Sequence, residues 1–180
     1  MDKTRFNTIS EALYTYGASD LNLNILESIS LEELIFISRS TQDQRASFRA
    51  AWTLEHILLN NNKLLHQYQE ELIDLYMVSE NWSTLRSVSK ILIRLTKELK
   101  FIEEHKEEKL LEKTFQVLSD INCPIAVRCN AYDIIFALTP KYEWLTNELR
   151  IQIQFDLEKN STPALSSRGL RVLKKLGMGN

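Results

Sequence analysis

The chain contains few of the residues that interrupt secondary structure. Its 180 residues include only four glycines and three prolines, whereas a sheet protein needs many turn residues to connect its strands. The glycines, Gly17, Gly169, Gly177 and Gly179, also cannot form a glycine-rich loop around a nucleotide phosphate. The sequence therefore predicts an all-α protein without a nucleotide cofactor.

Cysteine and histidine are scarce as well. Cys123 and Cys129 are spaced neither as a Cys-x-x-Cys pair nor as a disulfide framework, so we expect small buried apolar residues. The three histidines, His56, His66 and His105, form no His-Glu-x-x-His motif and no cysteine-histidine metal spacing. We therefore expect no metal, no cofactor and no catalytic residues.

Long apolar segments and an excess of positive charge are missing too. No apolar run approaches about 18 residues, and residues 1–6 lack the apolar stretch of a signal peptide. A cytoplasmic protein without a membrane partner is therefore expected. The net charge of -2 is unlike that of a general nucleic-acid binder, so a nucleic-acid role would need local segregation of charge.

An arginine recurs near the start of four helix-like segments. The four positions are Arg49, Arg86, Arg128 and Arg168, at intervals of about 40 residues. A period of this length without strand-like sequence is typical of stacked helical hairpins, in which each repeat contacts mainly its neighbours. The hydrophobic content of 44% is ordinary for a globular domain with its own core.

Capping signals and helical spacing divide the chain into hairpins. Ser30 and Glu33 have the form of a capping box. A second capping signal is expected at Thr41–Gln44, and Gly17 is placed to end the first helix. The predicted organisation of residues 1–180 is an N-terminal capping helix with a connector at 1–29 and hairpins at 30–62, 63–100, 101–140 and 141–180, with one helix expected over 64–78.

One segment carries a pattern known from helical repeats. An arginine is followed by a small residue and then by paired aliphatic residues, in the order Val127, Arg128, Ala131, Ile134, Ile135 and Leu138. This segment resembles the second helix of a HEAT repeat, and the resemblance covers residues 30–176. It implies a right-handed α-α superhelix of about four HEAT-like hairpins plus the N-terminal helix. It also implies that the repeat arginines bond carboxylates or carbonyl groups of neighbouring repeats.

Charge is divided between the two kinds of predicted helix. The second helices of the hairpins sum to a positive charge and the first helices to a negative one. Because second helices line the concave side of HEAT-like superhelices, the resemblance implies a basic inner face. At about 100° per residue, one stripe of the second hairpin is basic and the opposite stripe is apolar. The apolar stripe is Leu85, Val88, Leu92, Leu95 and Leu99. The residues predicted for the basic face are Arg49, Arg86, Lys90, Arg94, Lys97, Arg128, Arg168 and Arg171.

The basic face has two interpretations. It is either a solvated surface whose cations pair with nearby glutamates, or a groove for an acidic peptide, a phosphorylated partner or nucleic acid. The predicted function is that of a non-catalytic protein-interaction scaffold or adaptor whose second-helix face binds an acidic or phosphorylated protein or peptide partner. No small-molecule cofactor is expected.

Two enzyme classes can be compared with this sequence. Some bacterial alkylpurine DNA glycosylases are built from HEAT-like repeats with a basic cleft, tryptophans and a catalytic aspartate. This chain offers Trp52, Trp82, Trp144 and Asp133, but it does not match their catalytic motif residue by residue. DNA binding or glycosylase-like activity is therefore the alternative function. The segment 165–169 is not the glycine-serine-serine loop of adenylosuccinate lyases, so lyase activity is not expected.

Overall fold

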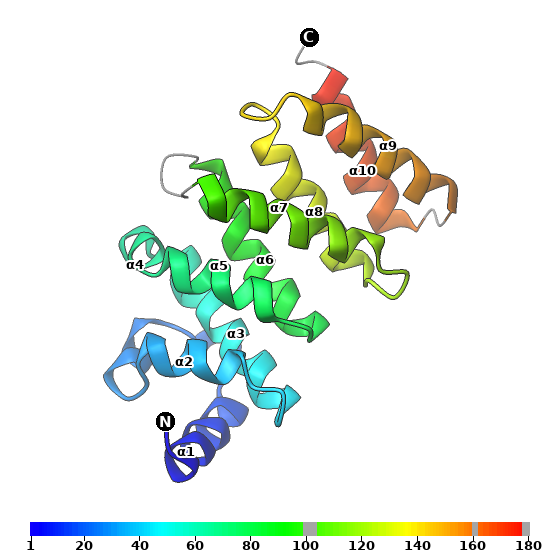
Figure 1. Ribbon diagram of the computed structural model, residues 1–180. Coiled ribbons are helices and arrows are strands. Elements are labelled where there is room, and N and C mark those ends of the chain that lie inside the picture. Colours follow the sequence, from blue (N-terminus) through cyan, green and yellow to red (C-terminus); the bar gives the residue numbers. More distant parts are fainter. Residues whose placement is uncertain (99–103, 160–161, 178–180) are drawn as a thin grey trace. The chain divides into compact units, whose positions relative to one another are not determined.

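The computed structural model describes residues 1–98, 104–159 and 162–177, and these residues form helices without any strand (Figure 1). The all-α prediction is therefore confirmed. The ten α-helices are α1 (Lys3–Thr15), α2 (Leu31–Ser38), α3 (Gln44–Leu59), α4 (Asn62–Gln67), α5 (Gln69–Val78), α6 (Trp82–Lys97), α7 (Glu104–Ser119), α8 (Ile125–Leu138), α9 (Trp144–Lys159) and α10 (Pro163–Gly177). Two short 3₁₀ helices, η1 (Ala18–Asp20) and η2 (Leu23–Glu27), connect α1 to α2.

The chain divides into two compact units, Met1–Leu95 and Thr96–Asn180. We call them the N-terminal unit and the C-terminal unit. In the N-terminal unit, α2 packs on α3, α1 packs on α3 and α2 also contacts α5. In the C-terminal unit, α8 contacts α7, α9 and α10, and α9 packs on α10. The predicted boundary between the second and third hairpins falls on residues 99–103, outside the described residues.

The start of α2 follows the predicted capping box. The backbone N–H of Glu33 donates to Ser30 Oγ at 3.2 Å, and the backbone N–H of Ser30 donates to Glu33 Oε2 at 2.9 Å. Arg5 of α1 adds an ion pair to the same carboxylate, with Nε 2.7 Å from Oε1. The capping residue of α2 therefore also fastens α1 to the N-terminal unit.

Two local predictions in the N-terminal unit were wrong in detail. Helix α3 is capped by Asp43 instead of Thr41, because the Asp43 carboxylate accepts the N–H of Ala46 at 2.9 Å. Helix α1 ends at Thr15, and Gly17 does not end it in a left-handed conformation, since its φ is −86°. Gly17 instead begins η1, where its N–H donates to Asp20 Oδ2 at 2.7 Å.

The single helix expected over 64–78 is divided into α4 and α5 at Tyr68, whose backbone leaves the helical conformation at φ −106° and ψ 18°. The Tyr68 hydroxyl donates to Glu32 on α2. At the other end of α4, the side chain of Asn61 accepts the N–H of Leu64 at 3.1 Å. The break is therefore accompanied by a contact with a different hairpin, which helical spacing does not reveal.

The C-terminal unit is built around α8. All the aliphatic and small positions of the repeat pattern, including Ala131, Ile134 and Ile135, are fully buried. Helices α9 and α10 approach closely at Gly169, where a Cβ atom would lie 2.9 Å from Ile153 Cγ2. A glycine inside a helix costs about 1 kcal/mol relative to alanine, and here the close approach of the two helices requires it.

Candidate functional site

The first predicted site residue, Arg49, is engaged within the N-terminal unit. Its Nε donates to the carbonyl of Leu13 at 2.8 Å, and its NH2 donates to the carbonyl of Tyr16. Its guanidinium also lies over the ring of Trp52, at 4.7 Å from the centroid. Because the last carbonyls of a helix have no partner within that helix, Arg49 completes the C-terminus of α1. Burial lowers the pKa of Arg49.

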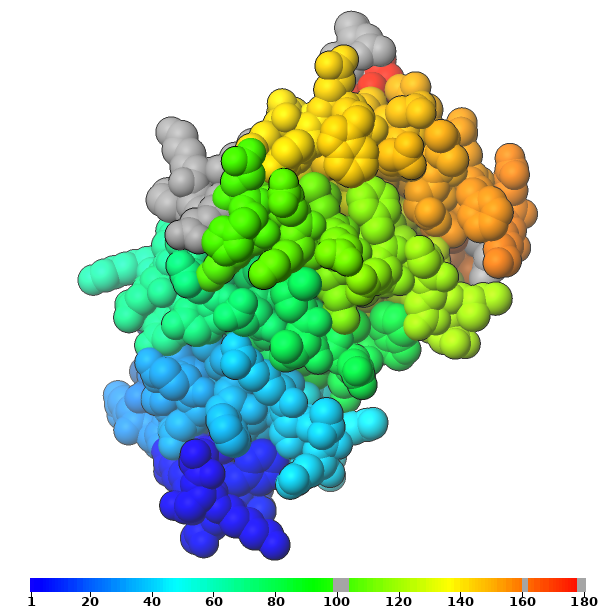
Figure 2. Space-filling model, viewed as in Figure 1, coloured from blue at the N-terminus to red at the C-terminus, as the bar shows by residue number. Residues whose placement is uncertain are grey.

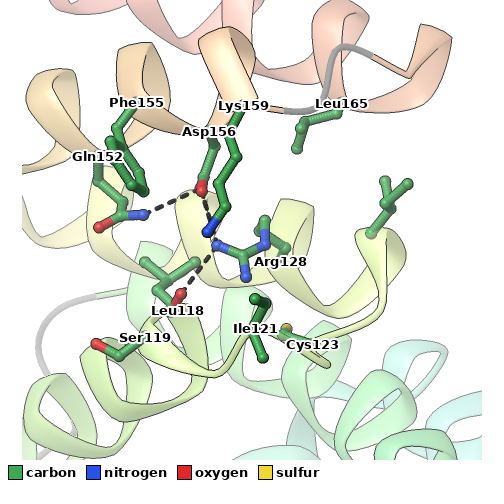
Figure 3. A pocket seen from close by; sticks show the side chains of 11 residues that line it. Leu118, Ser119, Ile121, Cys123, Arg128, Gln152, Phe155, Asp156, Lys159 and Leu165 are labelled. Atoms are coloured by element: carbon green, nitrogen blue, oxygen red, sulfur yellow. Dashed lines mark hydrogen bonds and ion pairs between the residues drawn. The ribbon is translucent and has the colours of Figure 1, made fainter.

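Arg128 completes the C-terminus of α7 in the C-terminal unit. It donates to the carbonyls of Leu118 and Asp120, both at 2.9 Å. Its NH1 also forms an ion pair with Asp156 of α9, 2.9 Å from Oδ1 (Figure 3). The same carboxylate accepts the hydroxyl of Tyr132 at 2.5 Å. Burial, followed by this bond, raises the pKa of Tyr132. Arg128 therefore joins α7, α8 and α9.

Lys90 and Arg168 link second helices of neighbouring hairpins. Lys90 on α6 lies 2.5 Å from Glu55 on α3, in the N-terminal unit. Arg168 on α10 pairs with Asp133 on α8, in the C-terminal unit. Each pair spans 35 residues of sequence, close to the repeat period. These two predicted site residues therefore also connect repeats.

The stripe predicted on α6 has the expected orientation. Its opposite side, Leu85, Val88, Leu92 and Leu95, is buried, whereas Leu99 lies outside the described residues. On the basic side, Arg86, Arg94 and Lys97 are exposed. Arg94 donates to the side chain of Asn62 at 3.3 Å.

Several cations of the C-terminal unit act on Asp133. Burial raises the pKa of this carboxyl, and Arg168, Arg171, Lys97 and Lys175 each act to lower it. Four cations from α6 and α10 therefore act on one aspartate of α8. We call Lys97, Arg168, Arg171 and Lys175 the basic cluster.

Sequence reasoning did not assign Lys175 to the site. The signal was present, because residues 168, 171 and 175 are spaced by three and four positions and so share one face of a helix. Lys175 also lies over the ring of Phe136, 5.6 Å from its centroid. Lys97, Arg171 and Lys175 are exposed. The structure thus joins the end of the α6 stripe to cations of α10.

The cysteines and acidic residues offer little for metal chemistry. Both cysteines are free and buried, as predicted, and burial raises the pKa of Cys123 to about 11. Within residues 1–98, 104–159 and 162–177, no group of three or more histidine, cysteine, aspartate or glutamate side chains could hold a metal ion. In the same part of the chain, no helix has both the length and the apolar character needed to cross a bilayer.

Helical hairpins joined by arginines and by ion pairs about one repeat apart define a helical-repeat protein. The family model of the HEAT repeat domain matches residues 9–176, so the chain belongs to the HEAT repeat family. This confirms the resemblance inferred from residues 30–176 and extends it into α1. Comparisons with curated proteins and with solved structures gave no match. Membership of the family indicates a role of the kind played by protein-interaction scaffolds.

Proposed function

We propose that this HEAT repeat protein is a non-catalytic scaffold or adaptor that binds an acidic or phosphorylated segment of a partner protein through the basic cluster. The observation that carries the proposal is that Lys97 on α6 and Arg171 and Lys175 on α10 are exposed, and that all three act electrostatically on Asp133, the carboxylate that Arg168 binds. Arg168 is committed to the ion pair with Asp133. The exposed cations Lys97, Arg171 and Lys175 are then the groups that meet a partner's anion.

The chemistry of these three side chains fits phosphate or carboxylate groups. Arginine presents a planar fork that binds such groups through two parallel hydrogen bonds, and lysine adds a compact positive charge. A phosphorylated side chain carries nearly two negative charges and three strong acceptor oxygens. In the N-terminal unit, Arg86 and Arg94 of α6 are also exposed cations.

The proposal is tested by charge reversal with a matched control. The test variant is Lys97→Glu, Arg171→Glu and Lys175→Glu, which leaves the Arg168–Asp133 ion pair in place. The control reverses three exposed lysines elsewhere, Lys3, Lys63 and Lys109, and so changes the net charge equally. Fluorescence anisotropy measures binding of a labelled glutamate-rich peptide and of a phosphoserine peptide. We expect the test variant to weaken binding by at least about tenfold and the control to have little effect. Equal losses in both variants would show that only net charge matters.

The natural partner is sought by affinity purification from the native cell and mass spectrometry, with the test variant in parallel. The alternative function is examined with duplex DNA containing an alkylated base. DNA binding would decline steeply with salt concentration, and a glycosylase would release the altered base. Either result, together with unchanged peptide binding in the test variant, would replace the scaffold proposal.

A further inference from the structure

Helix α9 has apolar side chains on two opposite faces. Leu145, Leu149 and Ile153 are completely buried against the rest of the C-terminal unit. Trp144, Ile151 and Phe155 are also large and apolar, yet they are 55%, 52% and 56% exposed. A surface helix normally has one apolar face, which points to the core. The core of this chain therefore does not account for the second face of α9.

The exposed apolar side chains share one side of α9. Trp144, Ile151 and Phe155 are separated by seven and four residues, so they lie within about 20° of one line along the helix. Phe115 of α7 stacks on Trp144, with ring centroids 6.3 Å apart. We call Phe115, Trp144, Ile151 and Phe155 the α9 ridge. In the C-terminal unit, α7 and α9 both contribute to the face seen in Figure 2.

A cavity lies at the Phe155 end of the α9 ridge, where α7 and α9 end (Figure 3). Its volume is about 420 Å³, which is within the range of roughly 300–1,000 Å³ found for ligand sites. Ile121, which is 77% exposed, and Leu165 contribute apolar surface to the cavity, and Arg128 and Lys159 contribute charge. The ridge thus ends at a recess that can receive a side chain of a bound segment.

Acidic side chains flank the α9 ridge along most of its length, and Lys159 at its end lies over the ring of Phe155, 5.6 Å from the centroid. Glu148 and Glu158 are exposed and lie about 40° to either side of the stripe on α9. On α7, the exposed residues Glu108 and Glu112 precede Phe115 by seven and three positions, which places them on its face of the helix. An apolar stripe between carboxylates is complementary to an apolar stripe between cations.

We propose that the α9 ridge is a docking site for an amphipathic helix of a partner protein, one whose apolar stripe is bordered by lysine or arginine. The ridge from Trp144 to Phe155 is about 16 Å long, so about three turns of a partner helix cover it. Recognition then follows the helix-in-groove mode, with apolar anchors at helical spacing. The site is independent of the basic cluster, which lies on α6 and α10 and selects partners of the opposite charge.

The test uses two synthetic helical peptides with the same leucine stripe, one with lysine and one with glutamate on its borders. Each is titrated into the full chain by calorimetry. We expect the lysine peptide to bind at least tenfold more tightly than the glutamate peptide. The emission of Trp144 should shift to shorter wavelength on binding, and Trp144→Phe should abolish this part of the change. Equal affinity for both peptides would overturn the proposed charge complementarity.

Protein variants locate the binding site. Ile151→Glu with Phe155→Glu should reduce binding of the lysine peptide at least tenfold, while circular dichroism and thermal unfolding remain unchanged. The matched control is Leu23→Glu with Val78→Glu, because these side chains are also exposed but lie outside α9. Undiminished binding in the ridge variant, or equal loss in both variants, would overturn the proposal.

Sedimentation equilibrium of the chain without peptide tests for a second copy as the occupant. A dimer that dissociates in the ridge variant and competes with the peptide would also overturn the proposal. The Lys97→Glu, Arg171→Glu and Lys175→Glu variant should bind the lysine peptide at least as well as the native chain. This result distinguishes failure at the α9 ridge from failure of the basic cluster.

Discussion

Arg49 of the N-terminal unit and Arg128 of the C-terminal unit bind the same kind of acceptor in different surroundings. Each donates to two carbonyls at the end of a preceding helix. Arg49 adds a contact with the face of Trp52, whereas Arg128 adds an ion pair with the buried Asp156. The comparison shows that the repeat arginine can complete a helix terminus in either unit, while the buried carboxylate is particular to Arg128.

The largest expected effect is that of Arg128→Ala. The Arg128 and Asp156 side chains are only 12% and 8% exposed, so the substitution leaves a carboxylate and two carbonyls in a poorly solvated environment. Removing one partner of a buried ion pair costs about 3–5 kcal/mol. Urea unfolding should show a loss of this size in the stability of the C-terminal unit. A loss below about 1 kcal/mol would mean that Asp156 is readily rehydrated.

Arg49→Ala should have a smaller effect than Arg128→Ala. The substitution leaves two carbonyl groups without their hydrogen-bond donor, but it breaks no described ion pair with a carboxylate. The expected loss of stability is about 1–3 kcal/mol. Hydrogen exchange should show faster exchange at the end of α1, near Thr15. A loss as large as that of Arg128→Ala would contradict the importance assigned to the buried carboxylate.

Acid should change the contributions of Glu33 and Asp133 to stability in opposite directions. The hydrogen bond and ion pair with Arg5 hold the pKa of Glu33 below its usual value. Its contribution to stability is therefore present above the unfolded pKa of about 4.3 and lost as pH falls through the folded value. Burial instead raises the pKa of Asp133, so its protonation below that raised value favours the folded C-terminal unit.

Hydrogen exchange with mass spectrometry between pH 7 and pH 3, after correction for the intrinsic rate, resolves the two units. Glu33→Gln should reduce the acid-induced loss of protection in the N-terminal unit. Asp133→Asn should increase the acid-induced loss of protection in the C-terminal unit, because it removes the favourable contribution that protonation of Asp133 makes to folding. A variant with the same pH profile as the native chain would disprove the sign assigned to the substituted residue.

The smallest expected effects come from the two ion pairs that link second helices. The Lys90 and Arg168 side chains are 39% and 33% exposed, whereas their partners Glu55 and Asp133 are 9% and 18% exposed, so solvent screens each pair from the side of the cation. Replacing either residue by alanine should cost about 1 kcal/mol or less. Urea unfolding of Lys90→Ala and Arg168→Ala in low and high salt measures this difference. A cost near that of Arg128→Ala would show that exposure does not distinguish these pairs from the Arg128–Asp156 pair.

Much of the fold could be predicted because its signals are local. The capping box of Ser30 and Glu33 and the apolar positions of α6 and α8 follow from residues within a few turns of one another. The break at Tyr68 could not be predicted in this way, since its hydroxyl bonds Glu32 from another hairpin. Lys175 was missed as a site residue for the same reason, because its approach to Asp133 depends on how α8 and α10 pack.

The sequence by itself determined that the chain is helical, where most helices lie and that positive charge gathers on the second helices, because periodicity and capping act within single helices. Only the tertiary structure decided which cations pair with carboxylates about one repeat away and which converge on Asp133. It also decided which apolar face of α9 enters the core. Leu145, Leu149 and Ile153 pack inside, while Trp144, Ile151 and Phe155 remain exposed, because α8 and α10 cover only one side of that helix.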